Sequence, residues 1–450
     1  ARRDQVEPLL DLAGCFMIGQ SLPALALRED IARHLARTPD EPAPADPGRA
    51  FLGVAGTAPV LLDSRARSRH LLACGATGTG KSTLLKNLIA ADIRAGVPVI
   101  LIDPHGDLYE DVLALLNRNP DLPVWTADTG DLDVPYSLNL LQSGGDIYRQ
   151  NFTCNQLIRL LKNSLYKNVP EGFGPMFEAY FRNAYLLLAD GGRGAFTIGD
   201  MHRVFGEAPF RRDLLGNCRN DQVKGFWSNI ATKAGGEASL ENIAPYIVSK
   251  LTQFVGNPII NPIVCARQST IDFNEILETG GNCIVSLAKG KVGATEAELL
   301  GGIFTTALFS AALARARQPL SERRPVRVYL DEFQSYAGET ISEMLAECRK
   351  YGLELTLATQ SLNRLRNMNG DLTQSVLGNT ANIVALRSGP DDAGLLSYWI
   401  GGDIAREEIM SLDDFQAVGR FLEQGRVTLP VSFRLEGEGK SHRLAAGSRQ

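Results

Sequence analysis

A glycine-rich run near residue 80 has the composition and spacing of a phosphate-binding loop. It reads Gly-Ala-Thr-Gly-Thr-Gly-Lys-Ser, ends at Ser82 and matches G-x-x-x-x-G-K-[ST]. Glycines let the backbone curl so that successive N–H groups point at phosphates, and the following helix adds the positive end of its dipole. The lysine reaches the β- and γ-phosphates, and the Ser82 hydroxyl ligates Mg²⁺. We expect ATP and Mg²⁺ to bind here, on Gly75, Ala76, Thr77, Gly78, Thr79, Gly80, Lys81, Ser82 and Thr83.

Two adjacent acids form a second candidate group. The apolar stretch 326–330 is a predicted strand, and Asp331 and Glu332 follow it directly. In P-loop motors such a strand is expected beside the P-loop strand, where the first acid holds the Mg²⁺ shell and the second polarises the attacking water. Acids are also common at helix N-termini. With the P-loop present, we interpret Asp331 as a metal ligand and Glu332 as catalytic, together with Lys81.

Polar residues end two further predicted strands. Gln360 follows the stretch 353–358 and is placed to touch the γ-phosphate or the attacking water, although a polar helix cap is the alternative. Asp103 ends the stretch 97–102 and is followed by Pro-His-Gly, so a structural turn is as good an explanation as chemistry. His105 has no partner His or Cys at metal-ligand spacing.

Two arginines are candidates for the cation that neutralises the transition state in a neighbouring subunit. Arg349 precedes the strand 353–358, and Arg387 follows a strand predicted over 382–386. Either is a candidate arginine finger. Ordinary surface arginines are the alternative.

Basic loops suggest a nucleic-acid contact. Each of two flexible segments presents a pair of cations, which suits a phosphate backbone, although solvated loops would look the same. The DNA-binding candidates are Arg364, Arg366, Lys289 and Lys291.

Short apolar strands alternate with helices around these motifs. A strand over 69–74 precedes the glycine-rich run, a helix over 81–95 follows it, and a further strand covers 282–287. This alternation predicts a RecA-like α/β fold with a parallel-rich central sheet covered on both faces. The stretch 146–250 has helical periodicity instead and predicts an inserted all-helical domain. We therefore divide the chain into an N-terminal helical segment with a Pro-rich linker (1–50), an ATPase domain in two parts (51–145 and 255–436), the helical insertion (146–254) and a polar tail (437–450).

Composition sets the class of protein. The 450 residues are 44% hydrophobic and carry a formal net charge of −5, which argues against a protein that coats nucleic acid with its whole surface. The seven cysteines have no CxxC spacing, so neither a zinc site nor a disulfide framework is expected. No apolar run approaches the roughly 20 residues of a membrane helix. We expect a cytoplasmic location or one at the cytoplasmic face of the inner membrane.

Taken in order, these motifs resemble the FtsK/HerA superfamily of hexameric DNA-pumping ATPases, and within it most of all the conjugative coupling ATPases of type IV secretion systems. The resemblance covers about residues 51–415. Its residues are the runs at 75–82, 101–107, 329–334, 347–353 and 358–362, with Phe173–Asn183 similar to the family's inserted helical domain. It implies a homo-hexamer with nucleotide at subunit interfaces, DNA in a central channel, and an arginine at the position of Arg349. It also implies secretion-system or relaxosome partners, and membrane contact only through a segment outside this chain.

The leading hypothesis is thus a DNA-stimulated ATPase that acts as a ring-shaped translocase or coupling motor in type IV secretion or conjugation. The alternatives are a HerA-like DNA-repair helicase, a secretion ATPase that acts on protein, and a slowly hydrolysing interaction module. Stimulation of ATP hydrolysis by DNA separates the first two of these four from the others.

Overall fold

The computed structural model describes residues 49–133, 136–165, 174–192, 196–235, 239–336, 338–366 and 372–436. The predicted N-terminal helical segment and linker, up to residue 48, and the polar tail from residue 437 lie outside the described residues. Phe173, the first residue of the run that resembles the family's helical domain, lies outside them as well.

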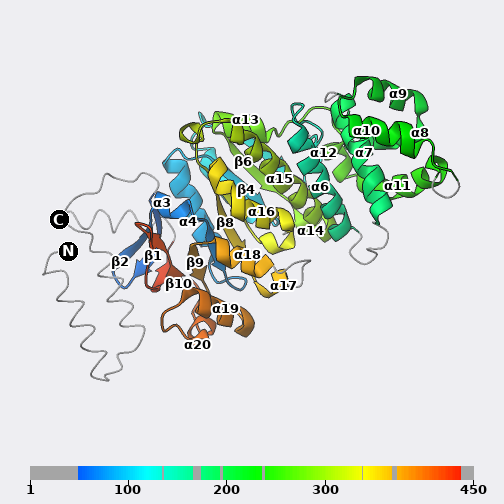
Figure 1. Cartoon of the computed structure of the whole chain (residues 1–450). Helices are drawn as coiled ribbons and strands as arrows, with labels where there is room; N and C mark the ends of the chain where they lie inside the picture. The colour runs from blue at the N-terminus through cyan, green and yellow to red at the C-terminus, as the bar shows by residue number, and fades with distance from the viewer. Residues whose placement is uncertain are drawn as a thin grey trace.

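An eleven-stranded sheet forms the centre of the described chain (Figure 1). Its strands run in the order β2-β1-β13-β10-β9-β3-β8-β7-β4-β6-β5. In that order they cover Ala58–Leu62, Ala50–Ala55, Val431–Leu435, Gln416–Arg420, Asn382–Ala385, Leu71–Cys74, Leu353–Thr359, Val326–Leu330, Val99–Asp103, Asn282–Ser286 and Val124–Asp128. A separate pair, β11 (Leu422–Glu423) and β12 (Arg426–Val427), lies outside this sheet.

The sheet is parallel from β9 to β5 and antiparallel at its other end. Strands β3, β4, β5, β6, β7, β8 and β9 pair in parallel, which confirms the predicted parallel-rich sheet. Strands β1, β2, β10 and β13 pair antiparallel and were not predicted. Polar residues interrupt β10 and β13, whereas β1 and β2 are apolar runs that the prediction overlooked.

The prediction that the strand before Asp331 lies beside the P-loop strand, β3, is wrong. The strand that precedes Asp331, β7, does not pair with β3, because β8 lies between them and pairs in parallel with both. Six of the seven residues of β8 are buried, and a strand covered on both faces fits the middle of a parallel sheet. Gln360, directly after β8, therefore follows the strand between the P-loop and the acids.

Alternate residues of the parallel strands face two separate cores. Leu71 and Ala73 pack with α4 (Lys81–Arg94) and α5 (Asp107–Leu116), whereas Leu72 and Cys74 pack on the opposite side. The opposite side is covered by α13 (Phe273–Thr279), α15 (Ala294–Ala314), α16 (Glu339–Glu347), α18 (Leu372–Asn379) and α19 (Pro390–Ile400). Period-two alternation along each strand thus builds the two covered faces that the apolar pattern predicted.

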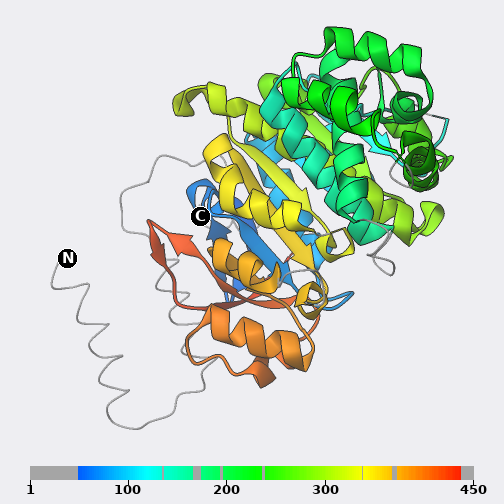
Figure 2. The ribbon, with the colours of Figure 1, turned by 45° about the vertical axis from the view of Figure 1, so that its right-hand side comes forward.

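Between β5 and β6 the described chain is helical. Figures 1 and 2 show most of these helices gathered beyond one end of the sheet. They are α6 (Ile147–Ser164), α7 (Pro175–Gly191), α8 (Met201–Gly206), α9 (Ala208–Asn217), α10 (Asp221–Gly225), α11 (Leu240–Val255) and α12 (Ile260–Val264), followed by α13. The remaining helices are α3 (Ser64–Arg67), α14 (Lys289–Val292), α17 (Asn363–Arg366) and α20 (Arg406–Met410). The division into an ATPase domain and an inserted helical domain stays our proposal.

In the described part of the chain, one helix, α15 with the 3₁₀ turn that continues it, is long and apolar enough to span a membrane by length and composition alone. It runs from Ala294 to Arg317, with a mean hydropathy of 1.5 in its most apolar window. Of that window, 78% is buried inside the protein. The sequence reading overlooked it because glycine, threonine and two glutamates interrupt the apolar residues. It packs against α6, α13 and the sheet, so we interpret it as a core helix.

A buried charge network joins α3, α4 and β7. Arg67 donates to both carboxylate oxygens of Asp92, at 2.6 and 2.7 Å, and also contacts the hydroxyl of Tyr329. Arg327 lies 3.5 Å from Asp92. Asp92 is fully buried and Arg67 is 2% exposed, so each charge relies on its partners to replace water.

Replacing Asp92 by Asn should destabilise the protein by about 3–5 kcal/mol, because it leaves the buried guanidinium of Arg67 without its counter-charge. The matched control is Asp111→Asn, which breaks a half-exposed pair between α5 and Lys86 of α4 and should change stability by less than about 1 kcal/mol. Urea unfolding midpoints of the two variants measure the difference. Equal midpoints would contradict a structural role for the network.

Candidate functional site

The glycine-rich run forms a loop fixed by its two neighbouring strands. The N–H of Gly75 donates to the carbonyl of Thr359, the last residue of β8, at 3.1 Å, and the N–H of Ala76 donates to the carbonyl of Arg387, two residues after β9, at 2.8 Å. Gly80 has a φ of 113°, which a side chain would strain, and it stands directly before α4. The loop therefore lies at the carboxyl edge of the sheet and leads into a helix N-terminus, as an anion cradle requires.

Lys81 is folded back into this loop. Its Nζ donates to the carbonyls of Gly75, at 2.7 Å, and Ala76, at 3.0 Å, and lies 3.8 Å from Oε1 of Glu332. Lys81 is 6% exposed. An ammonium group held by neutral carbonyls at the mouth of an anion cradle is placed to exchange those partners for phosphate oxygens.

Asp331 and Glu332 are both 7% exposed and close one side of the same pocket. Burial raises the pKa of Asp331 to about 7, and the carboxylates of Asp103 and Glu332 add to the rise. Oδ1 of Asp331 is buried and has no hydrogen-bond partner. A buried carboxylate oxygen of this kind fits a cation, which would favour its charged form.

Glu332 adopts an unusual backbone conformation, with a φ of 43°. Such values are rare outside glycine and often occur at functional sites. The side-chain amide of Gln334 donates to Oε2 of Glu332, and the hydroxyl of Ser335 donates to the Glu332 carbonyl at 2.6 Å. The following turn therefore fixes both the backbone and the carboxylate of this residue. The sequence reading assigned no role to Gln334.

The pocket around these groups has a volume of about 470 Å³. Besides Lys81, Asp331 and Glu332 it is lined by Thr77, Gly78, Gly80, Ser82, Thr83, Asp103, His105, Asp107, Leu108, Gln360 and Phe415. The structure therefore brings the predicted P-loop, the two acids and Gln360 to one place. No cluster of three or more His, Cys, Asp or Glu residues suited to a metal occurs among the described residues. Ser82 and Asp331 nevertheless fit Mg²⁺, which typically takes only one or two protein ligands together with phosphates and water.

Asp103 lines the pocket, but its carboxylate is occupied by hydrogen bonds of the turn. Its carboxylate accepts the N–H groups of His105, Gly106 and Tyr109 at 2.9–3.0 Å. These bonds fix the start of α5, which agrees with the structural interpretation of this segment.

Arg349 lies far from the P-loop of its own chain. It is exposed, lies in the short 3₁₀ helix η8 (Cys348–Tyr351) and precedes β8, at the amino edge of the sheet. Burial lowers the pKa of His70, which directly precedes β3, to about 4, with a smaller contribution from the positive charge of Arg349. Since the P-loop follows β3, the two ends of that strand separate Arg349 from Lys81.

Arg387 is in the opposite situation. Its carbonyl accepts the N–H of Ala76 in the P-loop, and its guanidinium donates to Asp414 at 2.6 Å. It therefore lies beside the phosphate loop of its own chain, with its side chain already paired.

The predicted DNA-binding residues lie on loops after parallel strands. Arg364 and Arg366 are exposed on α17, just after Gln360. Lys289 is half-buried and Lys291 exposed on α14, which follows β6. All four therefore lie at the carboxyl edge of the sheet, the edge that holds the P-loop.

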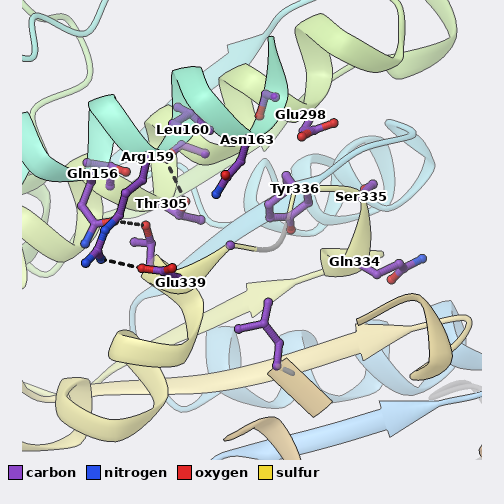
Figure 3. Close-up of a pocket in the computed structure, with 16 residues that line it drawn as sticks. Gln156, Arg159, Leu160, Asn163, Glu298, Thr305, Gln334, Ser335, Tyr336 and Glu339 are labelled. Carbon is purple, nitrogen blue, oxygen red and sulfur yellow. Dashed lines mark hydrogen bonds and ion pairs between the residues drawn. The ribbon is translucent and has the colours of Figure 1, made fainter. Parts of the chain in front are cut away.

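A second cavity lies where α6 meets the ATPase core (Figure 3). Arg159 of α6 pairs with Glu339 and Glu343 of α16 at 2.9 Å. Gln156 donates to Glu343 and accepts from Thr340, both at 2.8 Å. Figure 3 shows Gln334 in the wall of this cavity, with its side chain turned away from Arg159 and Glu339.

The six described cysteines, Cys74, Cys154, Cys218, Cys265, Cys283 and Cys348, are free thiols. The described part of the chain therefore contains no disulfide.

Comparisons with known proteins agree with this architecture. Family models match the helicase HerA central domain over residues 50–153 and the TraM recognition site of TraD and TraG over residues 325–411. No curated protein matches the chain.

Among solved structures, the plasmid coupling protein TrwB in complex with ADP and Mg²⁺ gives a TM-score of 0.63 at 20% identity, covering 91% of this chain and 92% of that one. The unbound bacterial conjugative coupling protein TrwBdeltaN70 gives 0.61 at 19% identity, covering 90% and 91%. VirB4 of Thermoanaerobacter pseudethanolicus gives 0.56 at 13% identity, covering 88% and 98%. These likenesses show a shared fold. Together with the two family models, they agree with the predicted resemblance to the FtsK/HerA superfamily and to its conjugative coupling ATPases.

Proposed function

We propose that the chain is the ATP-hydrolysing motor of a type IV secretion or conjugation system, a coupling ATPase that moves DNA and works as a ring. The observation that carries the proposal is the arrangement of charges around one sheet. Lys81, Asp331 and Glu332 meet at the carboxyl edge, whereas the exposed Arg349 lies at the amino edge.

In this proposal the P-loop N–H groups and Lys81 bind the β- and γ-phosphates. Ser82 and Asp331 hold Mg²⁺, which neutralises charge on the phosphate oxygens when bound. Glu332 accepts a proton from the attacking water, and Gln360 contacts that water or the γ-phosphate.

The proposal of a ring rests on a second positive charge, an arginine finger, that would have to come from a neighbouring subunit. Loose phosphoryl transition states gain about 10³–10⁵ in rate from an arginine finger. Arg349 is separated from its own P-loop by the length of β3, so it serves a neighbouring subunit. Arg387 lies beside its own P-loop and remains the alternative for a contact within the subunit.

DNA as the substrate rests on the exposed cations after the parallel strands. Arg364 and Arg366 follow Gln360 within six residues, so a change at the γ-phosphate has a short path to them. A secretion ATPase that acts on protein would not need this basic loop.

The junction in Figure 3 supplies a route from the helical segment to the catalytic loop. Arg159 holds α16, and the segment just before α16 carries Gln334, which donates to Glu332. A load on α6 would therefore act on the helix that connects the catalytic turn to Arg349.

Glu332→Gln should bind ATP but hydrolyse it about 10²–10⁴-fold more slowly, because it removes only the proton acceptor. Asp331→Asn should instead weaken Mg²⁺-dependent ATP binding. Equilibrium binding and single-turnover hydrolysis of both variants separate the two roles. If Glu332→Gln lost ATP affinity and Asp331→Asn kept it, the roles would be reversed.

Replacing Arg364 and Arg366 by Ala should weaken DNA binding and flatten its dependence on salt. Loss of two phosphate contacts lowers the slope of log K against log salt by about 1.4–1.8 for each subunit that touches DNA. The control is the double variant Arg65→Ala and Arg118→Ala, which removes two exposed arginines away from the carboxyl edge. An unchanged slope in the test variant would move the DNA contact to Lys289 and Lys291. Wild-type ATPase that does not respond to DNA would favour the protein-secretion alternative.

Mixing subunits tests the ring. Arg349→Ala and Lys81→Ala should each be inactive alone, because one lacks the finger and the other the phosphate ligand. A mixture should regain part of the activity, since some interfaces then pair an intact P-loop with an intact Arg349. The measurement is ATP turnover after co-assembly is confirmed by size. Normal turnover by Arg349→Ala alone would remove this residue from the site.

A further inference from the structure

Phe415 is an exposed aromatic residue in the wall of the P-loop pocket. It is 40% exposed, and none of the motifs includes it. Large apolar side chains are normally kept from water, so an aromatic ring left open inside a ligand pocket suggests a ligand that covers it.

The backbone of Phe415 is held in a strained conformation. Its φ is 65°, in the left-handed region that bulky residues rarely adopt. Its N–H donates to the carbonyl of Thr79 at 3.0 Å, and its carbonyl accepts the N–H of Leu435 at 2.7 Å. These bonds tie the residue both to the P-loop and to β13, so the surrounding structure maintains a conformation that costs energy.

The ring also packs closely against the P-loop. A Cβ placed on Gly80 would lie 3.1 Å from Cδ1 of Phe415. A glycine is therefore needed at position 80 because of its own positive φ and because Phe415 and Leu435 approach it closely.

The position of Phe415 in the sheet indicates which part of a nucleotide it would meet. β3 lies between β8 and β9, with β7 and its acids beyond β8. Phe415 directly precedes β10, which pairs with β9 on the other side of β3. If Asp331 and Glu332 face the γ-phosphate, the nucleotide extends across the P-loop, and its base lies on the side of β9 and β10.

We propose that Phe415 is the stacking platform for the nucleobase of the bound nucleotide, an inference that rests on the proposed function. An aromatic ring binds the flat face of a base by stacking. Every base has such a face, so the ring supports affinity without reading the base edge, and ATP and GTP gain alike from it.

The test compares a nucleotide with its phosphate chain alone. Phe415→Asn removes the ring and tolerates a left-handed backbone, whereas Phe415→Tyr retains the ring. With Mg²⁺ present, Phe415→Asn should bind ATP and GTP about 5- to 150-fold more weakly than the wild type. Its affinity for inorganic tripolyphosphate should be unchanged, and Phe415→Tyr should bind ATP like the wild type. Calorimetric titration gives all of these values, and thermal unfolding checks that each variant is folded.

The matched control is Tyr398→Asn, which removes an aromatic ring that is 81% exposed on α19 and lies outside the P-loop pocket. It should bind both ligands like the wild type. Equal losses of ATP and tripolyphosphate affinity in Phe415→Asn would mean that the ring only supports the P-loop, and no loss of either would mean that it touches no base. Both results overturn the stacking site. A wild-type protein that binds neither ligand would instead overturn the proposed function.

Discussion

The parallel pairing of β3 with β8 and β9 is the constraint on which the rest of the site depends. Through it, the first two N–H groups of the P-loop donate to the carbonyls of Thr359 and Arg387, which directly end or follow the neighbouring strands. The cradle is therefore fixed by backbone bonds from both sides before any ligand binds. Gln360 lies on one side of this frame, and Phe415 lies on the other, tied to Thr79. A preorganised cradle of this kind costs little reorganisation when phosphate binds.

Local signals in the sequence were enough to find the phosphate site. The P-loop spacing and the apolar stretch before Asp331 each depend on residues close together in the chain, and β7 covers the predicted range 326–330. The order of strands depends on long-range pairing instead, which is why β7 was placed beside β3 although β8 separates them. Strands β10 and β13 were missed because polar residues interrupt their apolar pattern, and β1 was missed although it is apolar. Phe415 gave no signal, since only the bonds to Thr79 and Leu435 hold it in the pocket.

The charges of the site suit both a positively charged ligand and a negatively charged one. Asp331 and Glu332 are adjacent and nearly buried, and burial raises the pKa of Asp331 to about 7. Lys81 is the cation that lines the pocket with them, and its ammonium is shared between two carbonyls at 3.8 Å from Glu332. A bound cation would favour the charged form of Asp331, and a phosphate chain would draw Lys81 from the carbonyls. The metal would thus compensate the buried charge of Asp331, and the phosphates would bind the buried ammonium of Lys81.

The short helix α16 has connections at both ends that a motor needs. At its start, Glu339 pairs with Arg159 of α6. Just before it, Gln334 donates to the carboxylate of Glu332, and just after it stands the exposed Arg349. Helices transmit displacement as rigid units because their backbone bonds are internal. A shift of α16 would therefore move the contact with the helical segment and the exposed arginine together. In the proposed ring, the arginine of one subunit would enter the site of the next, so this helix would connect the catalytic turn of one subunit to hydrolysis in its neighbour.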